Sequence, residues 1–179
     1  MKLPRRVKTK VRMDRYTDNL QELGYKYFDS GSFASVYAKP GSKNVIKVGK
    51  IQYQDAYIAF LKSIDETNPH FPKVKSVQLF KNSGGDYYVV EMERLINFFD
   101  VKDTSSKLTR LGITNDRDYY GQLDSMQELE FTPRTKHMKQ VKRVLRTLFN
   151  THNEDLHAGN VMWRKRGQGY QFVITDPVA

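Results

Sequence analysis

The sequence predicts an α+β protein of two lobes, in which a five-stranded antiparallel lobe precedes a reduced helical lobe. Two observations support this prediction. The first half of the chain is rich in alternating β-branched and aromatic residues, and turn signals divide it into short segments. The second half contains one strongly amphipathic helical segment, followed by two short strand-like runs. At 179 residues the chain is long enough for one domain made of two small lobes.

The N-terminal residues 1–16 are polar and basic without a clear period, so we expect a mobile arm there. Residues 1–15 contain seven Lys or Arg and one acid, and the whole chain has a formal net charge of +10. Such a surface suits an anionic partner, either nucleic acid, nucleotide or an acidic protein, or it is an ordinary solvated face. A short helix should follow, with Thr17 as its N-cap and Gly24 at its end.

Three antiparallel strands are expected next, near residues 25–29, 33–39 and 44–49. They are separated by turn signals at Ser30-Gly31 and Lys39-Pro40-Gly41. A helix should come after the third strand, because apolar residues recur there at helical spacing. This expected face consists of Tyr53, Tyr57, Phe60, Leu61 and Ile64.

Two further strands complete the expected sheet, over residues 73–80 and 86–93 on either side of a turn at residues 82–85. Residues 97–131 show no readable pattern. A helix is expected over residues 134–149, with Thr132 as its cap and Pro133 at its first position. Its apolar stripe is formed by Met138, Val141, Leu145, Leu148 and Phe149. Strand-like "NVMWR" and "YQFVITD" follow, and the lone Trp163 is expected in the core.

Several classes of protein are excluded by composition. There is no cysteine, which rules out disulfide and thiolate chemistry and suits a cytoplasmic location. No apolar run approaches the roughly 18 residues of a membrane helix, so no membrane partner is expected. His152, Asp155 and His157 could suggest a metal site, but their spacing does not align two imidazoles on one helix face. An RNA-binding sheet would fit the aromatic strands, but no RNP-like run is present.

Five residues lie along the chain in an order that points to phosphoryl transfer. Gly31 sits in a hairpin that could lie over phosphates, and Lys47 interrupts an apolar strand, where a covered ammonium would need an anion. Asp155 and Asn160 have the D-x-x-x-x-N spacing of an acceptor-orienting aspartate and a magnesium-binding asparagine. Asp176 ends the last strand-like run and can offer a carboxylate to Mg²⁺.

Five segments of the chain resemble those of a known family. They are "GSFASVYAKP", "NVIKVGK", "AYIAF", "LHAGNVMW" and "VITDPV", which span about residues 31 to 178. With these segments the chain resembles protein-kinase-like domains, and more narrowly the early serine/threonine kinases of short-tailed bacteriophages. The resemblance implies a kinase-like two-lobed fold and phosphorylation of Ser/Thr hydroxyls on host proteins with ATP and Mg²⁺, in the host cytoplasm. Those substrates could be acidic or nucleic-acid-associated proteins.

The resemblance also assigns residues. It implies catalytic roles for Lys47, Asp155 and Asn160, and magnesium binding by Asn160 and Asp176. It implies nucleotide contacts from the glycine loop and from the backbone of a hinge, which would bond an adenine edge. Those contact residues are Gly31, Ser32, Phe33, Val36, Lys47, Glu91, Met92 and Glu93. The acid that pairs with Lys47 is either Asp55 or Glu66.

The sequence departs from the kinase pattern at several points. Only Gly31 remains of the usual glycine-rich motif, and Asp176-Pro177-Val178 stands in place of D-F-G. His157 stands in the lysine position after the catalytic aspartate, so "DLHAGN" also resembles small-molecule phosphotransferases. No activation segment or later helices follow Asp176, so the chain is either a minimal kinase or a fragment.

The expected organisation is a basic arm at 1–16, an N-lobe at 17–96 and a truncated C-lobe at 97–179. A second copy of the chain or another partner could cover the helix at 134–149. Two functional alternatives remain open. One is a pseudokinase-like protein that inhibits a host protein or a nucleic-acid-associated partner through its basic surfaces. The other is a small-molecule phosphotransferase that acts on substrates such as aminoglycosides or choline.

Overall fold

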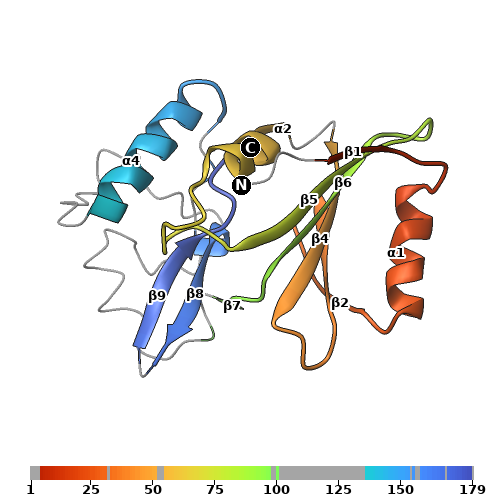
Figure 1. Cartoon of the computed structure of the whole chain (residues 1–179), viewed down its shortest axis with the longest axis horizontal. Coiled ribbons are helices and arrows are strands. Elements are labelled where there is room, and N and C mark those ends of the chain that lie inside the picture. The colour runs from red at the N-terminus through yellow and green to blue at the C-terminus, as the bar shows by residue number, and fades with distance from the viewer. Residues whose placement is uncertain are drawn as a thin grey trace. The chain divides into compact units, whose positions relative to one another are not determined.

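The protein is described by a computed structural model that covers two compact units (Figure 1). It describes residues 5–31, 33–51, 55–97, 100, 136–153, 155, 158–167 and 169–178. The first unit comprises Met1–Ile58 and Lys73–Arg94, and the second comprises Ala59–Pro72 and Leu95–Ala179. The helix α2 (Asp55–Ser63) contains the boundary between them.

The first unit is built on a mixed sheet with the strand order β1-β5-β6-β4-β3-β2. Its strands are β1 (Arg5–Lys8), β2 (Lys26–Ser30), β3 (Ala34–Ala38), β4 (Asn44–Lys50), β5 (Val74–Lys81) and β6 (Tyr87–Glu93). β2 to β6 pair antiparallel with one another, as the sequence predicts. The prediction of five strands was wrong by one, because β1 adds a sixth strand parallel to β5.

The predicted mobile arm is therefore partly a strand. Arg5–Lys8 pairs with residues 78–81 of β5, and the following segment leads into helix α1 (Met13–Glu22). The helix begins five residues earlier than predicted, with Arg12 rather than Thr17 at the N-cap. The Thr17 hydroxyl instead donates to the Asp14 carbonyl inside the helix (2.7 Å). Gly24 does end the helix, in the left-handed region at φ 85°.

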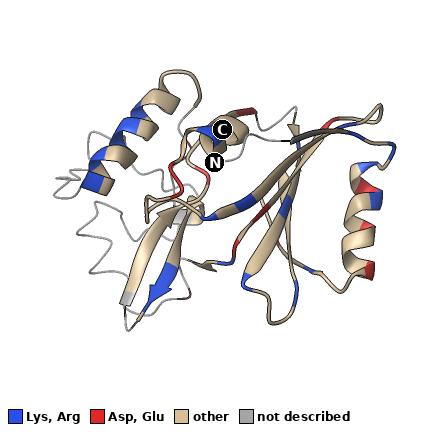
Figure 2. Cartoon of the chain, viewed as in Figure 1, with Lys and Arg blue, Asp and Glu red and all other residues tan. Residues whose placement is uncertain are grey.

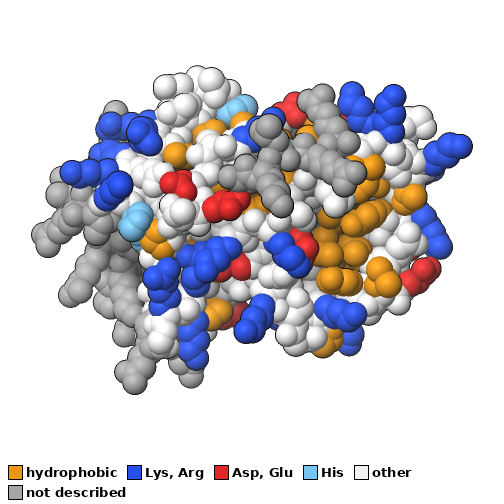
Figure 3. Space-filling view, in the orientation of Figure 1, with side chains coloured by type: hydrophobic (Ala, Val, Ile, Leu, Met, Phe, Trp, Pro, Cys, Tyr) orange, Lys and Arg blue, Asp and Glu red, His pale blue; other side chains and the backbone are white. Residues whose placement is uncertain are grey.

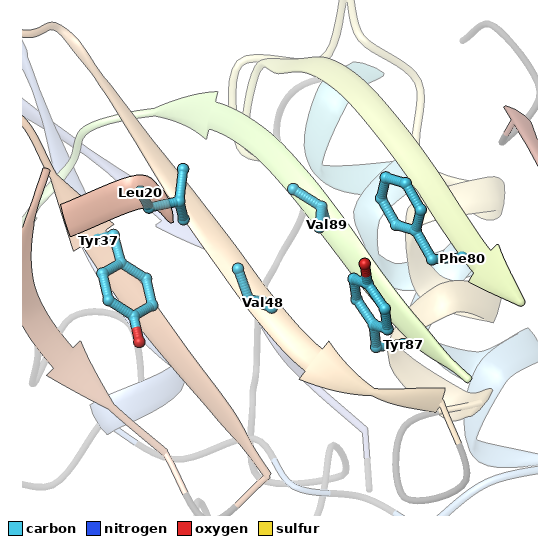
Figure 4. Packing of buried hydrophobic residues seen from close by; sticks show 6 residues of the cluster. All are labelled: Leu20, Tyr37, Val48, Phe80, Tyr87 and Val89. Carbon is cyan, nitrogen blue, oxygen red and sulfur yellow. The ribbon is translucent and has the colours of Figure 1, made fainter. Parts of the chain in front are cut away.

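One face of the sheet packs against α1 and forms a buried apolar cluster (Figure 4). Strand alternation places β4 residues Ile46 and Val48 on this face. Burial of these side chains stabilises the first unit, because each removes apolar surface from water. The buried members are Leu20, Tyr37, Val48, Phe80, Tyr87 and Val89.

The opposite face of the sheet carries Lys47, together with Gly49 of the same strand. Gly49 pairs with Tyr88 of β6 across the sheet. A Cβ added at Gly49 would lie 2.5 Å from the Tyr88 hydroxyl oxygen and 2.6 Å from its Cζ. The glycine thus leaves the space that the fully buried Tyr88 ring occupies, and Tyr57 of α2 packs on that ring at 5.6 Å between centroids.

The second unit combines one amphipathic helix with a small antiparallel sheet. Helix α4 (Lys136–Phe149) buries Met138, Val141, Val144, Leu145 and Leu148, which confirms the predicted apolar stripe apart from the half-buried Phe149. The sheet has the order β7-β8-β9, with β7 (Ile96–Asn97), β8 (Val161–Arg166) and β9 (Gly169–Ile174). Trp163 is buried there, as predicted.

A loop after α2 connects these elements within the second unit. Asn68, fully buried, donates from Nδ2 to the His137 carbonyl (2.9 Å) and to Gln140 Oε1 (3.0 Å), both on α4. The hydrogen bond from Gln140 to Asp65 is the largest cause that lowers the pKa of this carboxyl to about 2. The N-terminal turn of α4 is therefore fixed by side-chain hydrogen bonds.

Some predictions fall outside the described residues, namely those for Ser32, Tyr53, residues 101–131, Thr132, Pro133 and His157. No described helix is long and apolar enough to cross a membrane.

We predict that Gly49→Ala destabilises the protein, because its methyl group would overlap the buried Tyr88 ring. The expected loss is about 1–3 kcal/mol in the free energy of unfolding, measured by denaturant titration. Gly31→Ala is the matched control, since a Cβ there meets no atom within 4 Å. Equal stability of the two variants would contradict the packing described for Gly49.

Candidate active site

The centre of the candidate site is a short loop that closes on itself through one amide side chain. Asn160 ends the 3₁₀ turn η3 (Ala158–Asn160), directly before β8. Its Nδ2 donates to the Asp155 carbonyl oxygen (2.6 Å) and to Asp155 Oδ2 (3.0 Å). Only the amide NH₂ can donate to a carbonyl oxygen, so the Asn160 amide oxygen is directed away from Asp155.

This loop is fixed against the segment that follows β9. Asp155 N–H donates to the Pro177 carbonyl (2.9 Å), while both the N–H and the hydroxyl of Thr175 donate to the Asn160 carbonyl (2.8 and 2.9 Å). Asp176 lies between these two bonded residues, and its Oδ1 is buried. The sequence-predicted trio Asp155, Asn160 and Asp176 is thus brought together on two hydrogen-bonded segments.

Buried side chains hold the strands that lead into this loop. Arg164 of β8 is buried and donates from its guanidinium to the carbonyls of Pro69 and Phe71 (the latter at 2.9 Å). His70 packs on Phe172 of β9 with 4.4 Å between ring centroids, and its carbonyl accepts from Ile174 N–H (3.0 Å). The loop after α2 therefore supports β9 next to Asp176.

In the first unit, Lys47 lies in the middle of β4 and is half-buried. It pairs in register with Val36 on one side and Val90 on the other, so the three side chains share one sheet face. This is the face opposite Ile46 and Val48, as the alternation predicts. The Lys47 ammonium lies 3.6 Å from the centroid of the buried Tyr57 ring, a close cation–π contact.

Tyr57 was predicted only as part of an apolar helix face. Its contact with Lys47 depends on α2 covering this face of the sheet, which local spacing does not reveal. An aromatic residue early in the helix after the lysine strand is the signal that could have indicated it.

The glycine hairpin differs from expectation in one respect. Gly31 N–H donates to the Ala34 carbonyl (3.0 Å), which closes the turn between β2 and β3. This N–H is therefore used inside the hairpin and does not face a phosphate. Gly31 does leave open space where a side chain would stand, and Phe33 at the turn is 47% exposed.

The predicted hinge at Glu91 to Glu93 lies inside β6, between β4 and β5. Glu93 N–H donates to the Lys73 carbonyl (3.0 Å), and the Glu91 carboxylate accepts from Lys75 (2.7 Å) and from Asn44 (3.0 Å). The sheet thus already uses the Glu93 N–H, and the prediction that backbone groups of Glu91 to Glu93 bond an adenine edge stays a prediction. Met92 is buried and pairs with Val45, so its side chain faces the same side as Lys47.

The predicted acidic partner of Lys47 stays a prediction. Asp55 is exposed as the first residue of α2, where a negative charge suits the helix N-terminus. Glu66 is exposed in the turn after α2 and belongs to the second unit.

The donor set of the loop fits Mg²⁺. Asn160 and Asp176 offer hard oxygen ligands, which Mg²⁺ prefers, and two protein ligands suit an ion that keeps waters and binds substrate phosphates. Among the described residues there is no group of three or more His, Asp or Glu that could hold a metal.

An Asp–Asn loop in the second unit and a half-buried strand lysine in the first are residue types that phosphoryl-transfer proteins use. The model of the bacteriophage T7 protein kinase 0.7 family matches residues 5–179. The chain therefore belongs to this family.

One solved structure that matches the chain is Rad53 1-466 in complex with AMP-PNP. The TM-score is 0.43 at 14% sequence identity, and the match covers 92% of this chain and 43% of the Rad53 chain. The chain thus spans less than half of that protein. No curated protein matches the sequence.

We predict that Lys47 and Tyr57 are energetically coupled. A double-mutant cycle with Lys47→Met and Tyr57→Leu should give a coupling of about 1 kcal/mol in unfolding free energy, because the ammonium faces a buried ring. Tyr57→Phe is the control that keeps the ring and should retain the coupling to Lys47. Strictly additive effects of Lys47→Met and Tyr57→Leu would contradict the contact.

We predict a loss of stability in mild acid through His70. Burial is the main cause that lowers the pKa of His70 below its ordinary 6.5. A depressed histidine pKa means that the unfolded chain binds the proton first, so stability falls as the pH drops below about 6.5. The melting temperature should therefore fall less from pH 7.5 to 5.5 in His70→Gln than in the wild type. His152→Gln is the control, and equal slopes in all three proteins would contradict this role.

Proposed function

We propose that the protein transfers the γ-phosphoryl group of ATP, with Mg²⁺, to Ser or Thr hydroxyls of host proteins in the host cytoplasm. The observation that carries the proposal is the Asn160–Asp155 hydrogen-bonded loop beside Asp176, in a chain of a protein kinase family. Phosphoryl transfer mainly requires that the reacting groups are positioned and that the charge on the phosphate oxygens is stabilised. Two carboxylates and one amide oxygen at a loop between strands suit both tasks.

Asp155 orients the acceptor hydroxyl of the substrate in this proposal. Its Oδ2 is held by Asn160, which fixes the direction of the carboxylate. The acceptor hydroxyl oxygen forms a bond to the γ-phosphorus while the bond from that phosphorus to the leaving ADP oxygen breaks. The hydroxyl proton passes to the Asp155 carboxylate, which orients the attacking oxygen in line.

Asn160 and Asp176 have the metal role. When bound, Mg²⁺ neutralises charge on the phosphate oxygens. The Asn160 amide oxygen is directed away from Asp155, so one side chain both shapes the acceptor loop and offers a metal ligand. The Thr175 bonds to the Asn160 carbonyl hold Asp176 beside it.

The first unit binds the nucleotide in this proposal. Lys47 would pair with phosphates, while Val36 and Met92 on the same sheet face would contact the base. The hairpin with Gly31, Ser32 and Phe33 would cover the phosphates, with open space at Gly31 and with donors other than the Gly31 N–H. The cation–π contact with Tyr57 keeps the ammonium on this face.

A second candidate function is binding without catalysis. The observation that favours it is the basic exposed face of α4 (Figure 2), which would suit an acidic protein or nucleic-acid-associated partner. This face consists of Lys136, Lys139, Arg143 and Arg146, and α4 contains no acid.

We predict that Asp155 and Asn160 variants fail in different ways when labelled ATP, Mg²⁺ and host lysate are supplied. Asp155→Asn should lower kcat by about 10²-fold or more with little change in KM for ATP, because ATP binding does not need the acceptor aspartate. Asn160→Ala should raise the magnesium requirement, and added metal should restore part of its activity.

Asn153→Ala is the matched control, since this exposed asparagine lies in the same loop. Full activity of both Asp155→Asn and Asn160→Ala would overturn the catalytic assignment. Label on aminoglycosides or choline in place of polypeptide would show a small-molecule phosphotransferase. No transfer by the wild type would favour the binding function.

A further inference from the structure

A pocket of about 460 Å³ lies in the first unit, at the end of the sheet where β5 turns into β6. Basic side chains are visible around this end of the molecule in the space-filling view (Figure 3). The turn between the two strands and the segment between β1 and α1 form its walls. Its lining consists of Lys8, Thr9, Lys10, Lys81, Asn82, Ser83 and Asp86.

The pocket carries an excess of positive charge. Lys8 of β1 and Lys81 of β5 pair in register in parallel strands, so their side chains lie on one face as close neighbours. Like charges in such a position repel and destabilise strand pairing. Three ammoniums, including Lys10, and the carboxylate of Asp86 leave two positive charges among the described residues of the lining. In the part of the chain that is described, none of the three lysines forms an ion pair.

The walls of the pocket are held in place by hydrogen bonds. Asn82 Nδ2 donates to the carbonyls of Thr9 (3.0 Å) and Val11 (3.1 Å), and its Oδ1 accepts from Gly84 N–H (2.8 Å). Thr9 N–H also donates to the Lys81 carbonyl (3.1 Å). Because the side-chain amide of Asn82 already forms hydrogen bonds within the protein, the ammonium groups are the main donors that remain for a ligand. A mutually repelling cluster of exposed lysines on such hydrogen-bonded walls is suited to an anion.

We propose that this pocket binds an acidic segment of the protein substrate, with carboxylate side chains against Lys8, Lys10 and Lys81. This inference rests on the proposed function, because it assigns the substrate a docking segment apart from its acceptor hydroxyl. Two observations favour a polypeptide. β1 is the last strand of the described sheet, so its outer backbone edge can pair with an extended chain. None of the described residues of the lining has an aromatic side chain on which nucleic acid bases would stack.

The consequence for catalysis is a preference among substrates. A substrate with an acidic segment should have a lower KM than the same substrate with neutral residues there. The kcat should stay the same, because the pocket residues are not part of the Asp155 loop and contacts outside the reacting groups act on binding.

The test measures binding of a fluorescent glutamate-rich peptide to the full chain without nucleotide. The variant is the double substitution Lys8→Glu with Lys81→Glu. The control is Lys26→Glu with Lys43→Glu, both exposed, with Lys26 in β2 at the other end of the sheet order. Two Lys→Glu changes alter the charge by four units, so both proteins go from +10 to +6.

The pocket variant should bind the peptide about tenfold more weakly, since two ion pairs are lost and two repulsions are introduced. The control should change less than twofold, and added salt should weaken the wild-type complex. Lys10→Glu lies outside β1 and serves as a second variant, with a smaller expected loss, in case the double variant does not fold.

An equal loss in the pocket variant and the control would overturn the proposal, because binding would then follow net charge alone. Duplex DNA that binds more tightly than the peptide and is lost in the same variant would also overturn it. If the peptide binds as expected but no phosphate is transferred to any protein, the pocket stands and the proposed kinase function fails. If phosphate is transferred and the pocket variant binds the peptide like wild type, the pocket proposal fails and the proposed kinase function stands.

Discussion

The hydrogen bonds from Asn160 Nδ2 to the carbonyl and carboxylate of Asp155 are the interaction on which the rest of the candidate site depends. They close a loop of six residues and fix two functional groups at once. The carboxylate of Asp155 gains a defined direction, and the amide oxygen of Asn160 is turned to the other side. An asparagine can do both because it carries a donor and an acceptor on one short side chain. An aspartate at position 160 would place two carboxylates against each other.

The loop would be less well defined without its second attachment. Asp155 N–H and the Asn160 carbonyl both bond to the segment of Thr175 to Pro177, so the two ends of the loop lie along the residues around Asp176. The antiparallel pairing of β8 with β9 brings these segments together, since Val161 is in register with Ile174. Arg164 and His70 secure the same strands from the loop after α2. Three predicted site residues that are spread over more than twenty positions thus meet through one hairpin.

Much of this arrangement could be predicted from the sequence, because alternation and turn residues are local signals. The strands β2 to β6, the buried stripe of α4 and the face of Lys47 follow from periodicities of two and 3.6 residues. β1 could not be predicted in this way. Arg5–Lys8 contains one apolar residue, and its strand conformation comes from parallel pairing with a segment some seventy residues later.

The remaining differences between the sequence-based prediction and the structure also come from long-range contacts. The sequence identifies Gly31 and Glu93 as candidate nucleotide ligands, but not that Ala34 and Lys73 already accept their N–H groups. Nor does local spacing show that Tyr57 would lie over Lys47. Backbone donors and aromatic contacts are assigned by tertiary packing, so a motif alone overstates which groups are available to a ligand.

We propose that Asp176 and Asn160 complete a site for magnesium and nucleotide. The most direct measurement is the melting temperature of the full chain with and without millimolar Mg-ATP. A ligand that binds only the native state raises this temperature by mass action. We expect a clear rise in the wild type and a smaller rise in Asp176→Asn. No rise in the wild type, or the same rise in Asp176→Asn, would contradict the account.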